Sequence, residues 1–166
     1  MAWYTEKSMN TGLINHESVV TDNQVVYVTP GSKFNKIQRY DPRDIRSWSV
    51  LSPIPTNTLR SAVTLINNTE ILMIGGFFKT DNANTCQVFD IRSSRWRTFP
   101  SIPQKLSSSK AAEIGDKIYL FGGQLDKESF TSEVYSYNKF NPIQKWEIVE
   151  GIELTAANGF FSKVVF

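Results

Sequence analysis

One pattern of residues occurs three times along the chain and constrains its fold more than any other feature. Each copy has a short apolar run, a glycine pair, a polar stretch, a second run with an aromatic residue, and a closing tryptophan. The clearest copies are Ile71–Trp96 and Ile118–Trp146, and a weaker copy has Pro30-Gly31 in place of the glycine pair. The motif residues are Pro30, Gly31, Tyr40 and Trp48; Gly75, Gly76, Phe89 and Trp96; and Gly122, Gly123, Tyr137 and Trp146.

The spacing of the three copies indicates one repeated structural unit. Successive closing tryptophans are 48 and 50 residues apart, and the second residues of the glycine pairs are 45 and 47 residues apart. A fixed period of this size is typical of proteins in which each repeat is one supersecondary unit. We therefore expect the chain to be an array of similar units and not a fold with unrelated halves.

Each repeat is predicted to contain four short strands. The expected strands are 18–20, 24–29, 37–40 and 47–51; 61–66, 71–74, 85–89 and 95–99; and 109–114, 117–121, 133–137 and 145–149. Asp41, Asp90 and Asn138 follow the aromatic residue of their repeats, where a side-chain oxygen can cap a turn. No segment keeps the period of about 3.6 residues that marks an amphipathic helix. The sequence therefore predicts an all-β fold.

These motifs resemble the kelch repeat, a unit of about 50 residues with four strands, over nearly the whole chain. The resemblance implies twisted antiparallel blades that pack face to face, with Trp and Tyr side chains between neighbours. We expect three blades, at about 16–55, 58–103 and 107–152, and partial strands at 1–6 and 158–166. Because a complete propeller has about 4–8 blades, the expected fold is an incomplete kelch-type β-propeller. Its open blade faces are expected to self-associate.

Composition argues against several other functions. The chain has 18 basic and 16 acidic side chains, a net charge of +2, and the two signs are interspersed, so we expect no nucleic-acid partner. No apolar stretch approaches the ~18 residues of a membrane span, and no signal peptide is visible, which favours a cytoplasmic location. Cys86 and His16 are the only residues of their types, too few for a Cys-rich zinc site or a galactose-oxidase-like copper site. We predict no catalytic residue, cofactor or metal.

The loops between the second and third strands are the remaining candidates for function. They are expected at 32–36, 77–84 and 124–131, and kelch propellers commonly take partners with such loops. Their aromatic residues either pack locally or meet a partner. Arg60 matches a position where substrate-binding kelch proteins often carry arginine, although serine or asparagine takes that position in the later repeats. The candidate partner-binding residues are Phe34, Arg60, Phe77, Phe78, Lys79 and Phe130.

The leading hypothesis for function is a non-catalytic protein-interaction module that resembles short poxviral kelch-repeat proteins without a BTB domain. In the full-length family, the BTB domain recruits a cullin-3 ubiquitin ligase and the propeller holds the substrate. The resemblance implies a truncated viral relative with unknown protein partners in the host-cell cytoplasm. Three alternatives stay open: a cellular kelch adaptor fragment with cytoskeletal or ubiquitin-ligase partners, a decayed reading frame without function, and a propeller enzyme.

Overall fold

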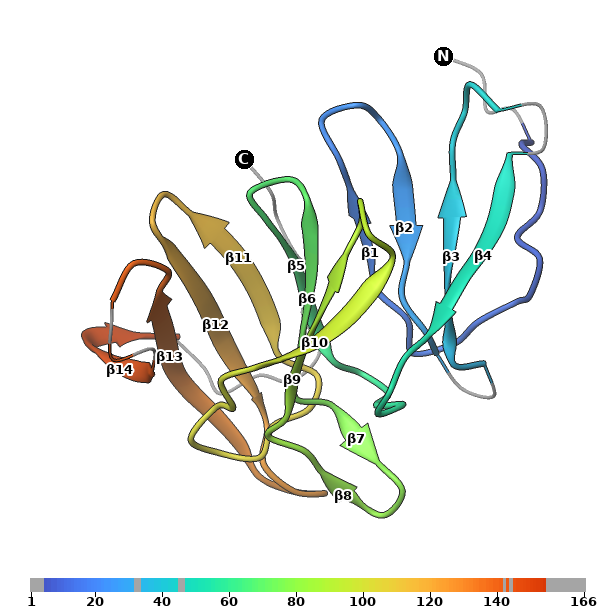
Figure 1. Cartoon of the computed structure of the whole chain (residues 1–166). Helices are drawn as coiled ribbons and strands as arrows, with labels where there is room; N and C mark the ends of the chain where they lie inside the picture. Colours follow the sequence, from blue (N-terminus) through green and yellow to red (C-terminus); the bar gives the residue numbers. More distant parts are fainter. Residues whose placement is uncertain (1–4, 32–33, 45–46, 142, 144, 155–166) are drawn as a thin grey trace.

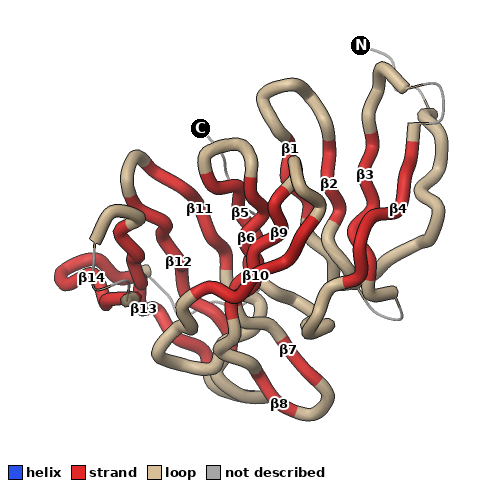
Figure 2. Tube along the Cα trace, in the orientation of Figure 1, coloured by secondary structure: helices blue, strands red, loops and turns tan. Residues whose placement is uncertain are grey.

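A computed structural model describes residues 5–31, 34–44, 47–141, 143 and 145–154. All regular elements in this part of the chain are β-strands (Figure 2). They form three four-stranded antiparallel sheets that stand side by side as blades (Figure 1).

Blade 1 contains β1 (Ser18–Val20), β2 (Val26–Val28), β3 (Lys36–Tyr40) and β4 (Trp48–Pro53). Blade 2 contains β5 (Ala62–Ile66), β6 (Glu70–Ile74), β9 (Cys86–Asp90) and β10 (Arg95–Phe99). Blade 3 contains β11 (Lys110–Ile114), β12 (Lys117–Gln124), β13 (Phe130–Asn138) and β14 (Trp146–Glu153).

The predicted fold class is confirmed, because the chain forms an incomplete propeller of four-stranded antiparallel blades. In each blade the strands pair in chain order, so the sheet is a simple meander. The predicted partial strand at 158–166 lies outside the described residues, as do residues 1–4 of the predicted strand at 1–6. The described Thr5 and Glu6 have no regular structure. The exact repeat boundaries stay predictions. No helix in the described ranges is long and apolar enough to cross a membrane.

Two of the predicted loops were wrong in part. The stretch expected as a loop at 77–84 carries a short ribbon, β7 (Phe77–Phe78) and β8 (Asp81–Asn82). In blade 3, β12 continues through its glycine pair to Gln124, which pairs with Phe130 at the start of β13. The sheet can extend because a bulge between Phe121 and Gly123 absorbs the irregular backbone of the two glycines. The expected loop at 124–131 is thus reduced to 125–129.

Each blade has two faces, and the motif aromatics mark one of them. We call the face that carries the closing tryptophan the front face and the opposite one the back face. On the front face the tryptophan lies beside the aromatic residue of the preceding strand. The ring centroids are 5.1 Å apart for Tyr40 and Trp48, 5.1 Å for Phe89 and Trp96, and 5.5 Å for Tyr137 and Trp146. Such pairs add about 0.5–1.5 kcal/mol beyond the area they bury.

The hydrophobic core consists of two junctions, each between the back face of one blade and the front face of the next. Between blades 1 and 2, Tyr27 and Ile37 join a cluster with Ile71 and Phe89 of the front face of blade 2. Between blades 2 and 3, the back face of blade 2 joins the front face of blade 3. This second cluster contains Ile66, Leu72, Val88, Ile118, Leu120, Tyr137 and Trp146. The expectation that the motif aromatics pack between neighbouring blades is therefore confirmed for blades 2 and 3. In blade 1, Tyr40 and Trp48 are half-buried and belong to neither cluster.

The segments that connect the blades are held on the front faces by a recurring contact. The amide of Gln87 in β9 donates to Thr56 O at 2.9 Å and accepts from Thr56 N at 2.9 Å. Gln38 in β3 makes the same pair of bonds with Thr11, at 2.9 and 3.0 Å. The indole of Trp146 donates to Pro100 O at 2.9 Å, and that of Trp48 to Lys7 O at 2.8 Å. Residues 7–15 therefore lie on blade 1 as interblade connectors lie on blades 2 and 3, and they run beside β4 in Figure 1.

The predicted turn-capping residues are confirmed by their hydrogen bonds. Asp90 Oδ1 accepts from Arg92 N and Ser93 N, both at 2.8 Å, and Asn138 Oδ1 accepts from Phe140 N at 2.9 Å. Asp41 Oδ1 accepts from Arg43 N at 3.1 Å and from its guanidinium at 2.9 Å. The hydrogen bonds from the Arg43 side chain and backbone, together with one from Arg39, hold the pKa of Asp41 well below its usual range.

The depressed pKa of Asp41 predicts an acid-sensitive contribution to stability. Because the folded-state pKa lies below the unfolded value of about 3.9, the stabilisation is fully present above that value and is lost as pH falls below it. We expect Asp41→Asn to lower the melting temperature at pH 6 and to have a progressively smaller effect below about pH 4. Thermal melts of both proteins by circular dichroism, from pH 6 down to about pH 2, test this. A difference that does not change with pH would contradict it.

Candidate partner-binding site

A pocket of about 390 Å³ lies where blades 2 and 3 meet, at the end of the molecule that carries the β7–β8 ribbon. The ribbon contributes lining residues on one side, and the end of β12 with the turn that follows it contributes them on the other. Figure 1 shows where these two segments of the chain run. Two hydrogen bonds connect these sides, since the Asn82 amide donates to Gln124 O at 2.7 Å and to Leu125 O at 2.9 Å. The pocket is lined by Arg60, Phe77, Thr80, Asp81, Asn82, Gln124, Asp126 and Lys127.

Arg60 is positioned by backbone contacts with both neighbouring blades. Its φ of +54° is in the left-handed region, as are those of Asn15 (+58°) and Ser108 (+56°) at the same place before the first strand of their blades. Arg60 N donates to Asn15 O at 3.3 Å, and Ser108 N donates to Arg60 O at 2.8 Å. This row of hydrogen bonds runs from blade to blade and fixes the direction in which the Arg60 side chain leaves the backbone.

The Arg60 guanidinium lies over an aromatic ring and has no acidic partner within the described part of the chain. Its central carbon is 5.9 Å from the centroid of the Phe77 ring. The backbone of Phe77 is held in place, because it exchanges hydrogen bonds of 2.6 and 2.9 Å with the backbone of Leu59. None of the ion pairs among the described residues includes Arg60. A half-buried arginine stacked on a ring can still donate to a carboxylate or carbonyl group of a ligand.

The two carboxylates of the pocket are already engaged. Asp81 forms an ion pair with Lys105 at 2.6 Å, and the hydrogen bond from Lys105 lowers the pKa of Asp81. Asp126 Oδ1 accepts from Glu128 N at 2.9 Å and from Ser129 N at 2.8 Å. These bonds, led by that from Glu128 N, lower the pKa of Asp126. Both groups therefore stay ionised near neutral pH and are bound to their neighbours, whereas none of the ion pairs among the described residues includes the cations Arg60 and Lys127 of the same pocket.

The structure brings together only two of the predicted partner-binding residues, Arg60 and Phe77. Phe78 is 37% exposed at the ribbon tip, with the Lys79 ammonium 5.1 Å from its ring centroid, and neither residue lines the pocket. Phe34 is half-buried, belongs to blade 1 and does not line the pocket. Phe130 is half-buried and, contrary to the loop prediction, begins strand β13.

Sequence reasoning missed the pocket residues from blade 3. Gln124, Asp126 and Lys127 lie within the predicted loop at 124–131, but their polar side chains gave no reason to prefer them to other loop residues. Their turn could have been anticipated, because Asp126 precedes Ser129 by the spacing of a side-chain cap. The proximity of these residues to Arg60 could not be anticipated, because it depends on how blade 3 packs against blade 2.

The residues considered for catalysis do not form a site. Cys86 is buried in the junction between blades 2 and 3, and burial raises the pKa of its thiol to about 12, so it stays protonated at neutral pH. His16 is exposed just before β1. In the described ranges, no group of three or more His, Cys, Asp or Glu side chains could hold a metal ion.

Blades of four antiparallel strands, packed face to face through aromatic junctions, make this chain part of a β-propeller. The solved structure of YjhT has the same fold, with a TM-score of 0.74 and 17% identity over 87% of this chain and 53% of its own. Comparison with protein-family models finds no match. The curated relatives show that the chain is a homologue of kelch-repeat proteins, as its motifs predict.

Three of these relatives illustrate the range of the similarity. An F-box/kelch-repeat protein of Arabidopsis thaliana is 31% identical over 139 residues, 72% of this chain and 39% of the relative. Kelch repeat and BTB domain-containing protein 2 of horsepox virus is 25% identical over 159 residues, 88% of this chain and 28% of the relative. Kelch-like protein 40 of Xenopus laevis is 28% identical over 141 residues, 78% of this chain and 23% of the relative. The chain thus spans about a quarter to two-fifths of their length.

Proposed function

We propose that this chain is a non-catalytic protein-interaction module that holds its partner at the pocket between the β7–β8 ribbon and blade 3. One observation carries the proposal: Arg60 projects over Phe77 into this pocket without a carboxylate partner in the described structure. A partner segment with an acidic side chain next to an apolar one would match this pair, because the guanidinium supplies charge-assisted hydrogen bonds and the ring an apolar surface.

The relatives suggest two classes of kelch protein to which this chain could belong, since their names combine kelch repeats with F-box or BTB domains. Similarity to the horsepox protein over 88% of this chain supports a viral kelch module that acts on host proteins in the cytoplasm. The plant and amphibian relatives, at comparable identity, support a cellular adaptor as the second candidate. Both candidates use the propeller in the same way, to hold another protein.

Replacing Arg60 by alanine is expected to weaken partner binding by about 10- to 100-fold, since hydrogen bonds to a charged group contribute about 1.5–3 kcal/mol. Proteins captured by the tagged chain from host-cell lysate would be quantified by mass spectrometry for the wild type and for Arg60→Ala. Arg92→Ala, an exposed arginine in the β9–β10 turn, is the matched control. The proposal predicts at least one protein that the wild type and Arg92→Ala retain and Arg60→Ala loses.

Two results would contradict the proposal. If Arg60→Ala keeps its melting temperature and captures the same proteins as the wild type, the pocket is not the partner site. If the purified chain contains stoichiometric copper or iron by metal analysis, the non-catalytic assignment is wrong, because a bound redox metal would point to a propeller enzyme.

A further inference from the structure

A second pocket between blades 2 and 3 lies at the opposite end of β6 from the β7–β8 ribbon. Its volume is about 320 Å³, and its lining comes from three parts of the chain. These are the turn between β5 and β6, the strand β10 with the residue that follows it, and the end of β13 with its turn. The pocket shares no lining residue with the pocket that contains Arg60.

The wall of this second pocket includes a tyrosine with an unused hydroxyl group. Tyr137 is 4% exposed, and its ring centroid lies 4.7 Å from that of Phe99. The hydroxyl groups of Tyr40 and Tyr135 donate to other side chains at 3.3 and 3.0 Å, whereas that of Tyr137 forms no hydrogen bond in the described part of the chain. Packing does not require this hydroxyl group, because Phe89 occupies the same repeat position in blade 2 and is fully buried.

The Tyr137 hydroxyl group is a hydrogen-bond donor at neutral pH. Burial raises the pKa of Tyr137, and the nearby Arg97 guanidinium offsets only part of this rise. The phenol therefore keeps its proton and can donate it to an acceptor in the pocket.

Two cations of the same pocket also keep unused donors. Arg97 donates to Glu70 from Nε at 3.2 Å and from one terminal nitrogen at 2.9 Å to each carboxylate oxygen, so its other terminal nitrogen is left without a partner among the described residues. Lys139 Nζ donates to Glu113 at 2.5 Å and to Asn67 Oδ1 at 3.0 Å, which leaves the third N–H of the ammonium group.

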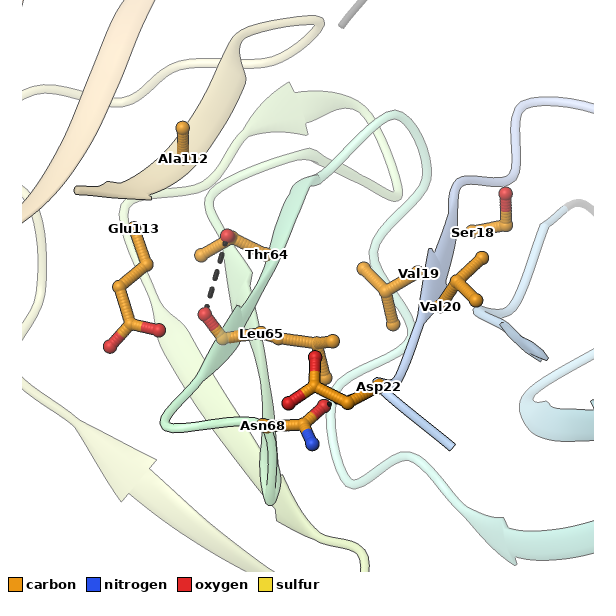
Figure 3. A pocket seen from close by; sticks show the side chains of 9 residues that line it. All are labelled: Ser18, Val19, Val20, Asp22, Thr64, Leu65, Asn68, Ala112 and Glu113. Carbon is orange, nitrogen blue, oxygen red and sulfur yellow. Dashed lines mark hydrogen bonds between the residues drawn. The ribbon is translucent and has the colours of Figure 1, made fainter. Parts of the chain in front are cut away.

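The carboxylates next to these cations are already bonded. Glu70 holds Arg97 through the three hydrogen bonds above. Glu113 accepts from Asn67 N at 3.2 and 3.0 Å as well as from Lys139. Glu113 is not part of the lining of this pocket, but lines a separate hollow of about 400 Å³ formed mainly by β1, β5 and β11 (Figure 3). The second pocket thus offers donors from Tyr137, Arg97 and Lys139 to a ligand.

We propose that this second pocket binds an anionic oxygen group, a carboxylate or a phosphate, carried on an apolar body. Anionic oxygens form strong, charge-assisted hydrogen bonds with guanidinium and ammonium groups, and the phenol adds a third donor. Phe99, Pro100 and Phe140 supply an apolar wall beside these donors, and the volume is in the range of small-molecule sites. The inference does not depend on the proposed partner site, because the two pockets are lined by different residues.

Binding of phenylacetate and of phenyl phosphate to the purified full chain, measured by saturation-transfer NMR of each probe, tests the inference. We expect at least one of these anions to bind saturably, and the tighter of the two identifies the preferred group. Phenylacetamide, the neutral counterpart of phenylacetate, should bind at least about tenfold more weakly, because it lacks the charge.

Two variants locate the binding in the second pocket. Arg97→Gln is expected to raise the dissociation constant of the bound anion at least about tenfold. Arg92→Gln, an exposed arginine in the β9–β10 turn, is the matched control and should leave it unchanged. Tyr137→Phe removes only the hydroxyl group and should raise the dissociation constant at least about threefold without lowering the melting temperature.

A third variant should strengthen binding, which a poorly folded protein could not do. Glu70→Gln keeps an oxygen that accepts from Arg97 but removes the negative charge beside the ligand, so the dissociation constant should fall at least about threefold. Three results would overturn the proposal: neither anion binds saturably, phenylacetamide binds as tightly as the anions, or Arg97→Gln and Glu70→Gln both bind as the wild type does.

Discussion

Replacing Gly76 by alanine is expected to lower the free energy of unfolding by at least about 3 kcal/mol. Gly76 has a φ of +103°, a conformation that residues with a side chain rarely adopt. A β-carbon there would lie 2.4 Å from Ser61 Oγ and 2.8 Å from Leu59 O, and the latter is backbone that pairs with Phe77. The backbone of Gly76 cannot move away easily, because its N–H donates to Leu106 O at 2.7 Å.

Chemical denaturation of the purified variants measures this loss, and Gly12→Ala is the matched control. Gly12 is exposed, has no positive φ, and a β-carbon there would meet no atom within 4 Å. The control should differ from the wild type by no more than about 0.5 kcal/mol. If Gly76→Ala and Gly12→Ala were equally stable, the backbone conformation at position 76 would not require glycine.

Replacing Trp146 by alanine is expected to cost about 3–5 kcal/mol of stability, the range for removing a large aromatic side chain from a core. Trp146 is 4% exposed and its ring lies 5.5 Å from that of Tyr137 and 6.5 Å from that of Phe99 across the junction between blades 2 and 3. The substitution also removes the indole N–H that donates to Pro100 O. The cavity and the unsatisfied carbonyl group both weaken the contact between the blades.

The same substitution at Trp48 is the informative comparison. Trp48 occupies the equivalent position on the front face of blade 1 but is only half-buried, beside the N-terminal connector. We therefore expect Trp48→Ala to cost clearly less than Trp146→Ala in thermal melts under the same conditions. A larger loss at Trp48 would mean that the first connector contributes more to stability than the junction between blades 2 and 3.

The class of fold can be predicted from the amino-acid sequence alone. Recurring aromatic residues and tryptophans in register predict four-stranded units, and the turn residues Asp41, Asp90 and Asn138 cap the backbone as their positions predict. These features could be predicted because they depend on local hydrogen bonds and on the period of the repeat, both of which are visible along the chain.

The position of the candidate partner-binding site depends on how whole blades pack and cannot be read from the sequence. Asn15, Arg60 and Ser108 share a left-handed backbone and a row of interblade hydrogen bonds, although no side-chain type is common to them. The extension of β12 beyond its glycines depends on pairing with β13, which the first and second repeats do not reproduce. The hydrogen bonds between blades join residues some 45 positions apart in the chain. They form only when whole sheets pack together, and the packing energy depends on the two faces that meet and not on any local sequence pattern.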